Sequence, residues 1–121
     1  EESGQNYLER WEFLNAYSGC MIGNPAISVL VDAYKKGIRD YDVEKAWRLA
    51  DQTSKRFGNA LHGYVPNSVS ETLEYAYTEW CMAEFAKALG KTEEERKYRE
   101  WPENGRLTEG FGCVESNPFQ Q

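Results

Sequence analysis

The chain has 121 residues, 40% of them hydrophobic and 14% aromatic, which is enough for one domain with an apolar core. A formal net charge of -6 argues against nucleic acid and anionic membranes as partners, because binding to both depends on basic residues that neutralise phosphate. The three cysteines fit neither a zinc motif nor a disulfide framework, and no apolar run reaches the roughly 18 residues of a membrane span.

Residues 1–23 show no helical pattern and are predicted to be irregular or extended. Within them, Trp11 and Glu12 place an aromatic ring beside a carboxylate. Proteins hold a pyranose in this way, because the ring stacks on the apolar face of the sugar while the carboxylate hydrogen-bonds to its hydroxyls. The alternative is a core tryptophan next to an exposed glutamate. Trp11 and Glu12 are therefore candidate sugar-binding residues.

Two helices are predicted next from their caps and their apolar spacing. Asn24 is a good N-cap, Pro25 suits the first helical position, and Gly37 ends the first helix. The second helix is predicted from Asp42, as its cap, to about Arg56.

A loop predicted over residues 58–67 holds the only histidine, His62. It has no second histidine and no carboxylate pair at ligand spacing, so a metal site built on it is not expected. A surface or hydrogen-bonded structural role is favoured.

The clearest predicted element is a long helix that begins after Ser68 and ends at Gly90. Ser68 and Glu71 match a capping box. The helix carries a broad apolar face, which consists of Val69, Leu73, Ala76, Tyr77, Trp80, Met82, Ala83, Ala86 and Leu89. Cys81, on the same helix, is interpreted as a buried small apolar residue.

Three glutamates on this helix, Glu71, Glu74 and Glu79, admit two interpretations. One is an acidic site. The favoured one gives Glu71 its capping role and leaves the other two as solvated charges or as members of pairs within the helix.

Thr92 and Glu95 match a second capping box, so a short turn is predicted to reverse the chain into a helix that runs to about Trp101. The two helices form a helical hairpin. The predicted fold class is therefore all-α, with irregular structure from Pro102 onward.

The last residues, 110–121, have the glycines, the proline and the polar and aromatic side chains of a loop that positions a functional group. They contain one carboxylate, Glu115, with Phe111, Val114 and Phe119 as apolar neighbours. Glu115 is either a solvated surface charge or a general acid whose proton is held by partial burial.

Four stretches of the sequence, residues 19–42, 63–66, 68–83 and 86–91, resemble glycoside hydrolase family 92. Members of that family are calcium-dependent exo-acting α-mannosidases. The resemblance runs in order over residues 11–121. It implies that the chain is a fragment of a helical catalytic domain with the (α/α)6 barrel fold, and that residues 1–121 hold no complete domain.

The resemblance also implies a role for Glu115. In the family, a segment of the form Thr-Glu-Gly-Asn-Ala-Trp-Gln-Tyr carries the general acid, and residues 114–121 line up with it. Glu115 then takes the position of the acid, while Asn117 and Gln120 are retained as substrate-binding residues. Glu109 lies in a similar Thr-Glu-Gly run but lacks the following Asn and Gln, so it is the poorer match.

By the same resemblance, other parts of the machinery lie outside this chain. Family members add an N-terminal β-sandwich, and their general-base aspartates and calcium ligands follow the general acid. The implied partners are a mannose-containing glycan, such as an N-glycan, and the rest of the parent chain. The implied location is secreted, periplasmic or at the cell surface, although residues 1–4 do not begin a signal peptide.

The isolated 121 residues are expected to be inactive and poorly stable, because apolar side chains such as Val69, Leu73 and Trp80 would lack partners. Two alternatives remain open. One is a non-enzymatic module in which the helical hairpin binds another protein. The other is a lectin-like mannose binder on the same scaffold.

Overall fold

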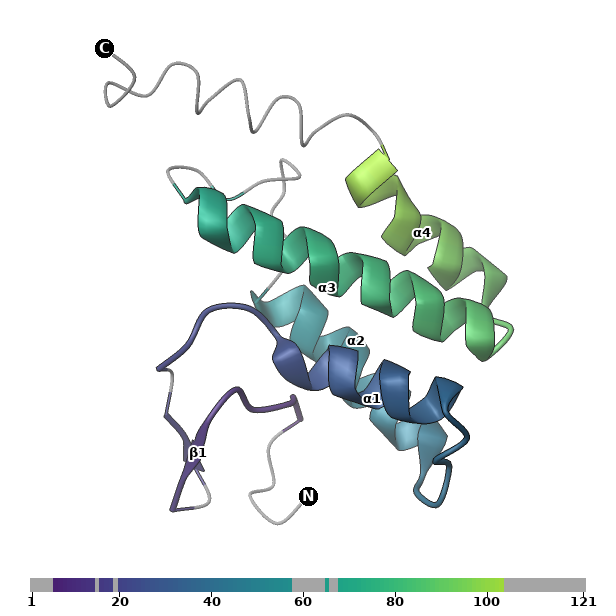
Figure 1. The fold of residues 1–121 in the computed structure, drawn as a ribbon, viewed down its shortest axis with the longest axis horizontal. Coiled ribbons are helices and arrows are strands. Elements are labelled where there is room, and N and C mark those ends of the chain that lie inside the picture. The colour runs from purple at the N-terminus through teal and green to yellow at the C-terminus, as the bar shows by residue number, and fades with distance from the viewer. Residues whose placement is uncertain (1–5, 15, 19, 58–64, 66–67, 104–121) are drawn as a thin grey trace.

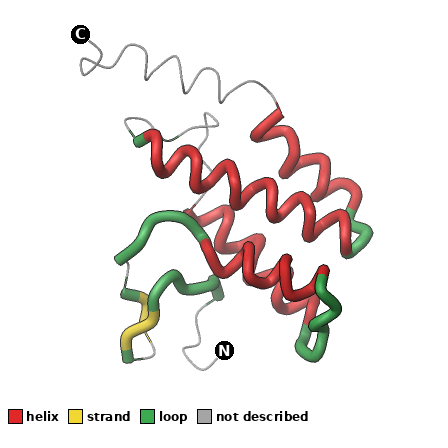
Figure 2. The backbone as a smooth tube through the Cα atoms, viewed as in Figure 1, coloured by secondary structure: helices red, strands yellow, loops and turns green. Residues whose placement is uncertain are grey.

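The computed structural model describes residues 6–14, 16–18, 20–57, 65 and 68–103. Its elements, in chain order, are β1 (Glu12–Phe13), β2 (Ala16–Tyr17), α1 (Pro25–Lys35), α2 (Val43–Phe57), α3 (Val69–Ala88) and α4 (Thr92–Glu103). The two short strands pair antiparallel, with Glu12 opposite Tyr17 and Phe13 opposite Ala16. Helices make up nearly all of the regular structure, as Figure 2 shows, so the predicted all-α class is confirmed.

The long helix α3 lies at the centre of the arrangement (Figure 1). It runs back along α4 on one side and packs against α1 and α2 on the other. The predicted helical hairpin is therefore confirmed as α3 and α4. The strands β1 and β2 belong to an N-terminal segment that lies beside the start of α1.

All four helices contribute to one apolar core. The ring of Trp47 meets the rings of Phe85 and Tyr98 edge-on, with centroid distances of 5.6 and 6.3 Å. Tyr34 lies against the other side of Phe85, with a centroid distance of 5.7 Å. Such tilted aromatic contacts stabilise a core beyond the area that they bury. Ile27, Met82 and other buried apolar side chains of the four helices pack around these rings. Cys81 is buried among them, as predicted.

Glycine ends both α1 and α3 in the way that the sequence predicts. Gly90 has a φ of +75°, the N–H of Lys91 reaches the carbonyl of Ala86 at 2.9 Å, and the N–H of Gly90 reaches that of Lys87 at 3.2 Å. This pair of bonds is a Schellman motif, which favours glycine because of the positive φ.

The predicted N-caps are confirmed only in part. Asp42 caps α2, because its Oδ1 accepts a hydrogen bond from the backbone N–H of Lys45 at 3.0 Å. Asn24 and Ser68 stand at the N-cap positions of α1 and α3, but neither side chain makes a capping hydrogen bond. The capping role that we predicted for these two side chains is wrong.

The start of α3 is held by Thr72 instead of by the predicted capping box. The Thr72 hydroxyl donates to the carbonyl of Ser68 at 2.8 Å and accepts from the N–H of Val65 at 3.0 Å. The expected box at α4 also differs, because that helix begins at Thr92 itself and Glu95 accepts a hydrogen bond from Arg99 at 3.0 Å. α4 ends at Glu103, two residues beyond the predicted end, so the irregular structure predicted from Pro102 onward begins later than expected.

Candidate functional site

Trp11 lies at the surface, immediately before β1. Its side chain is 58% exposed, so the alternative of a core tryptophan is wrong. The indole N–H contacts the sulfur of Met21 at 3.0 Å, and the backbone carbonyl of Trp11 accepts bonds from the Ser18 hydroxyl and N–H at 2.8 and 2.9 Å. The strand pair and these contacts hold an aromatic face open to solvent. Glu12 lies in β1, and its side chain is outside what the structure describes.

The loop that follows β2 brings the start of α1 against α3. Gly23 has a φ of +79°, and a Cβ at this position would stand 3.1 Å from Oε2 of Glu74 on α3. A side chain at residue 23 would therefore require Glu74 to move by a few tenths of an ångström, and the positive φ would strain any residue other than glycine. The next residue, Asn24, is only 3% exposed, and neither Nδ2 nor Oδ1 has a hydrogen-bond partner among the described residues.

A buried carboxyl group lies where α2, α3 and α4 meet. Glu79 on α3 is 4% exposed and accepts a hydrogen bond from the hydroxyl of Ser54, which is fully buried on α2. Burial raises the pKa of Glu79 to about 7, the Ser54 hydrogen bond opposes this shift, and the nearby charge of Asp51 adds to it. Our interpretation of Glu79 as a solvated charge or a partner within its helix is therefore wrong.

A second polar link between helices lies beside Glu79. The hydroxyl of Tyr98 on α4 donates to Oδ1 of Asp51 on α2 at 2.5 Å, and Lys55 reaches the other oxygen of Asp51 at 2.6 Å. Burial raises the pKa of Tyr98, and the hydrogen bond to Asp51 raises it further. The phenol therefore stays protonated and acts as a donor. Together with Ser54 and Glu79, these groups form a polar cluster that ties three helices.

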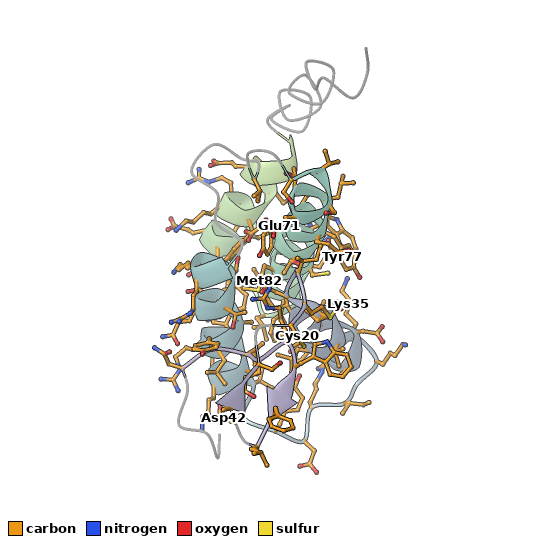
Figure 3. The ribbon with its side chains drawn as sticks, turned by 90° about the vertical axis from the view of Figure 1, so that its left-hand side faces the viewer. Cys20, Lys35, Asp42, Glu71, Tyr77 and Met82 are labelled. Carbon is orange, nitrogen blue, oxygen red and sulfur yellow. The ribbon has the colours of Figure 1, made fainter. Side chains whose placement is uncertain are left out.

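A stripe on the other side of α3 is exposed. It consists of Val69, Leu73, Tyr77 and Trp80, and we call it the α3 stripe. The rings of Tyr77 and Trp80 are nearly parallel, with centroids 6.3 Å apart, and the ammonium of Lys35 lies 6.0 Å from the Trp80 ring. Figure 3 shows Tyr77 and Lys35 on the same side of the molecule. The predicted exposure of Val69, Leu73 and Trp80 is confirmed.

Other predicted site residues are not placed. Glu115, Asn117 and Gln120 lie outside the described residues, and so do Glu109 and His62. Their roles stay predictions.

The acidic side chains of the described residues do not fit a calcium ion. Within the described ranges, no group of three or more His, Cys, Asp or Glu side chains is arranged to hold a metal. Asp51 and Glu79 are near enough to interact electrostatically, but both carboxyl groups already have partners. Asp51 is bound by Tyr98 and Lys55, and Glu79 is bound by Ser54. The described residues therefore do not form a calcium site. No helix among them is long and apolar enough to cross a membrane.

The sequence matches the model of the glycosyl hydrolase family 92 catalytic domain over residues 1–106. This range contains all four helices and ends before the segment of Glu115. No curated protein matches the chain.

Solved structures agree with this match. The chain is 34% identical to a family GH92 α-mannosidase from Bacteroides thetaiotaomicron, with a TM-score of 0.71, over 79% of this chain and 14% of that chain. The same enzyme in complex with mannoimidazole gives a TM-score of 0.70 with the same identity and coverage. A family GH92 inverting mannosidase from Bacteroides thetaiotaomicron VPI-5482 is also 34% identical, with a TM-score of 0.72 over 83% of this chain and 16% of that one. The chain therefore spans 14–16% of the length of these relatives.

Proposed function

This chain belongs to glycosyl hydrolase family 92, as a piece of the family's catalytic domain, and on that basis we propose that it is part of an inverting exo-α-mannosidase. The enzyme would remove terminal α-linked mannose from glycans such as N-glycans. The observation that carries the proposal is the agreement with the family's catalytic domain over the whole helical part of the chain, in sequence and in the arrangement of the helices.

Glu115 is the proposed general acid. An inverting glycosidase needs two carboxyl groups, roughly 6.5–9.5 Å apart, of which one protonates the leaving oxygen while the other activates a water on the opposite face of the sugar. Glu115 would supply the proton, and a base outside these residues would activate the water. The support is the similarity of residues 114–121 to the family segment that carries the acid.

The exposed face of Trp11 supports its proposed role as a wall of the sugar pocket. A ring that is held open to solvent beside a strand pair is available to stack on a pyranose. Glu12, Asn117 and Gln120 are proposed to hydrogen-bond to the substrate, on the strength of the sequence patterns alone.

The remaining parts of the enzyme are proposed to lie elsewhere in the parent chain. Calcium would be held by residues beyond those described, and an extracytoplasmic location follows only from the family. We further propose that another part of the catalytic domain covers the α3 stripe. Two observations support this: α3 is apolar on two opposite sides, which is typical of a helix in the interior of a larger domain, and the relatives are much longer than this chain.

An assay of the full-length enzyme on α-mannosides tests the function. We expect release of mannose, with the β-anomer seen first by NMR because inversion changes the configuration of the α-linkage. Chelation of calcium is expected to lower the activity, and added calcium to restore it. Binding of mannose without turnover would favour the lectin-like alternative, and neither binding nor turnover would favour a protein-binding module.

A further inference from the structure

The side chain of Asn24 is the strongest sign of a missing binding partner. It is 3% exposed, and both its amide nitrogen and its carbonyl oxygen are buried without a hydrogen bond among the described residues. A buried amide that makes no hydrogen bonds destabilises a fold, and buried polar groups in native proteins are rarely left in this state. Such an exception calls for a partner that the described residues do not supply.

The position of Asn24 limits the charge of the ligand that could bind to its amide. It directly precedes α1, a helix of 11 residues, yet its side chain does not cap that helix. A helix N-terminus alone attracts anions. Here the carboxylate of Glu74 lies against Gly23, the neighbour of Asn24, so a negatively charged ligand is disfavoured.

A neutral ligand with hydroxyl groups fits these conditions. The Asn24 amide offers two donors and one acceptor oxygen, and each hydroxyl both donates and accepts a hydrogen bond. Two neighbouring hydroxyls of a pyranose satisfy Nδ2 and Oδ1 together. The loop that ends at Asn24 contains Met21, whose sulfur contacts the indole N–H of the exposed Trp11 at 3.0 Å.

We propose that the Asn24 amide, at the start of α1 and beside Glu74, binds hydroxyl groups of the sugar substrate. This inference rests on the proposed mannosidase function. It adds a substrate-binding residue that lies at the junction of α1 and α3, far in the sequence from Glu115. It also explains why the structure tolerates a buried unsatisfied amide, since residues that serve binding are often retained at a cost in stability.

The experiment compares KM and thermal stability in the full-length enzyme, with an α-mannoside as substrate. Asn24→Leu keeps the size of the side chain and removes both polar atoms. We expect KM to rise about five- to tenfold, which is the effect of losing roughly one net hydrogen bond, while the Tm of the ligand-free enzyme stays the same or rises. Asn24→Asp provides a second variant, which keeps the acceptor and loses the donor; its KM is also expected to rise.

Tyr41→Phe is the matched control, because the Tyr41 hydroxyl is likewise buried without a hydrogen-bond partner among the described residues but lies beyond the other end of α1. Its KM is expected to equal that of the wild type. If KM is unchanged in the two Asn24 variants, the amide is satisfied by water or by another part of the protein, and the inference is overturned. A wild-type enzyme that releases no mannose refutes the proposed function before Asn24 is changed, and the inference falls with it.

Discussion

Ser54 donates a hydrogen bond to the carboxyl group of Glu79, from α2 to α3, and both side chains are buried. The packing of three helices removes the Glu79 carboxyl group from water, and this hydrogen bond gives one of its oxygens a partner. It lies beside the hydrogen bond between Tyr98 and Asp51, so these polar contacts join α2 to both α3 and α4.

The buried acid predicts a pH-dependent stability. The folded-state pKa of Glu79, about 7, lies above its ordinary value of 4.5, so the protonated form is favoured by folding. This contribution is fully present below pH 4.5 and is lost as the pH rises through about 7. The shift corresponds to about 3 kcal/mol. Thermal unfolding of the full-length protein between pH 5 and pH 8 is expected to show the loss.

Glu79→Gln is the matched variant, because it keeps the size of the side chain and cannot ionise. Its Tm is expected to depend less on pH than that of the wild type over the same range. Asp51 on α2 and Tyr98 on α4 lie in the same polar cluster as Glu79. Both residues are unchanged in the Glu79→Gln variant, so a difference between the two pH profiles reports on Glu79. Equal pH profiles for the two proteins would show that Glu79 does not titrate in this range.

Loss of the Tyr98 hydroxyl is expected to weaken the attachment of α4 to α2. Tyr98→Phe removes the donor to Asp51 and keeps the ring that packs against Trp47. We expect the free energy of unfolding to fall by about 1.5–3 kcal/mol, as for hydrogen bonds to charged groups. Tyr41→Phe serves again as control and should have little effect. Chemical denaturation of both variants checks this, and equal stabilities would contradict it.

Glu84 joins three helices through two ion pairs. Its carboxylate contacts Lys35 on α1 and Arg99 on α4, and these hydrogen bonds lower its pKa. Stability from these pairs is therefore present above the ordinary pKa and is lost as the pH falls. Glu84→Gln should lower Tm at low salt and have a smaller effect at high salt, because salt screens charges. The exposed pair of Asp32 and Lys36 provides the control. Asp32→Asn should leave Tm nearly unchanged, and a salt-independent effect of Glu84→Gln would count against the electrostatic explanation.

Residues 1–121 alone are expected to hydrolyse no mannoside and to self-associate. Only one of the two required carboxyl groups is proposed to lie in them, and the α3 stripe exposes Tyr77 and Trp80. Trp80→Gln should reduce the association seen by size-exclusion chromatography, whereas Val29→Gln, which removes an exposed side chain on α1, should not. A monomeric, active fragment would contradict both expectations.

Local sequence features predicted most of the fold. Helix ends depend on residues close in the chain, and Gly37 and Gly90 act at the predicted positions. The caps at Asn24 and Ser68 were predicted wrongly, because both residues stand at the N-cap positions but neither side chain makes a capping hydrogen bond. At α3, the link between Thr72 and Val65 takes the place of the capping box.

The polar cluster was missed although a signal was present. Glu79 lies in the middle of a series that repeats every three or four residues, with the buried residues Thr72, Tyr75, Ala76, Met82, Ala83 and Ala86. A charged residue within such a series indicates a buried acid. Its partner Ser54 is 25 residues away, and no local pattern connects the two. The exposure of Trp11 likewise depends on how the N-terminal segment packs.

Turnover by the Glu115→Gln variant of the full-length enzyme tests the central claim most directly. The carboxamide cannot donate the acid's proton, so we expect turnover of natural α-mannosides to fall by roughly 10²–10⁴-fold while mannose binding is retained. Glu109→Gln, six residues earlier in the chain, is the control and should remain active. Near wild-type turnover by Glu115→Gln on these substrates would contradict the assignment of Glu115 as the general acid.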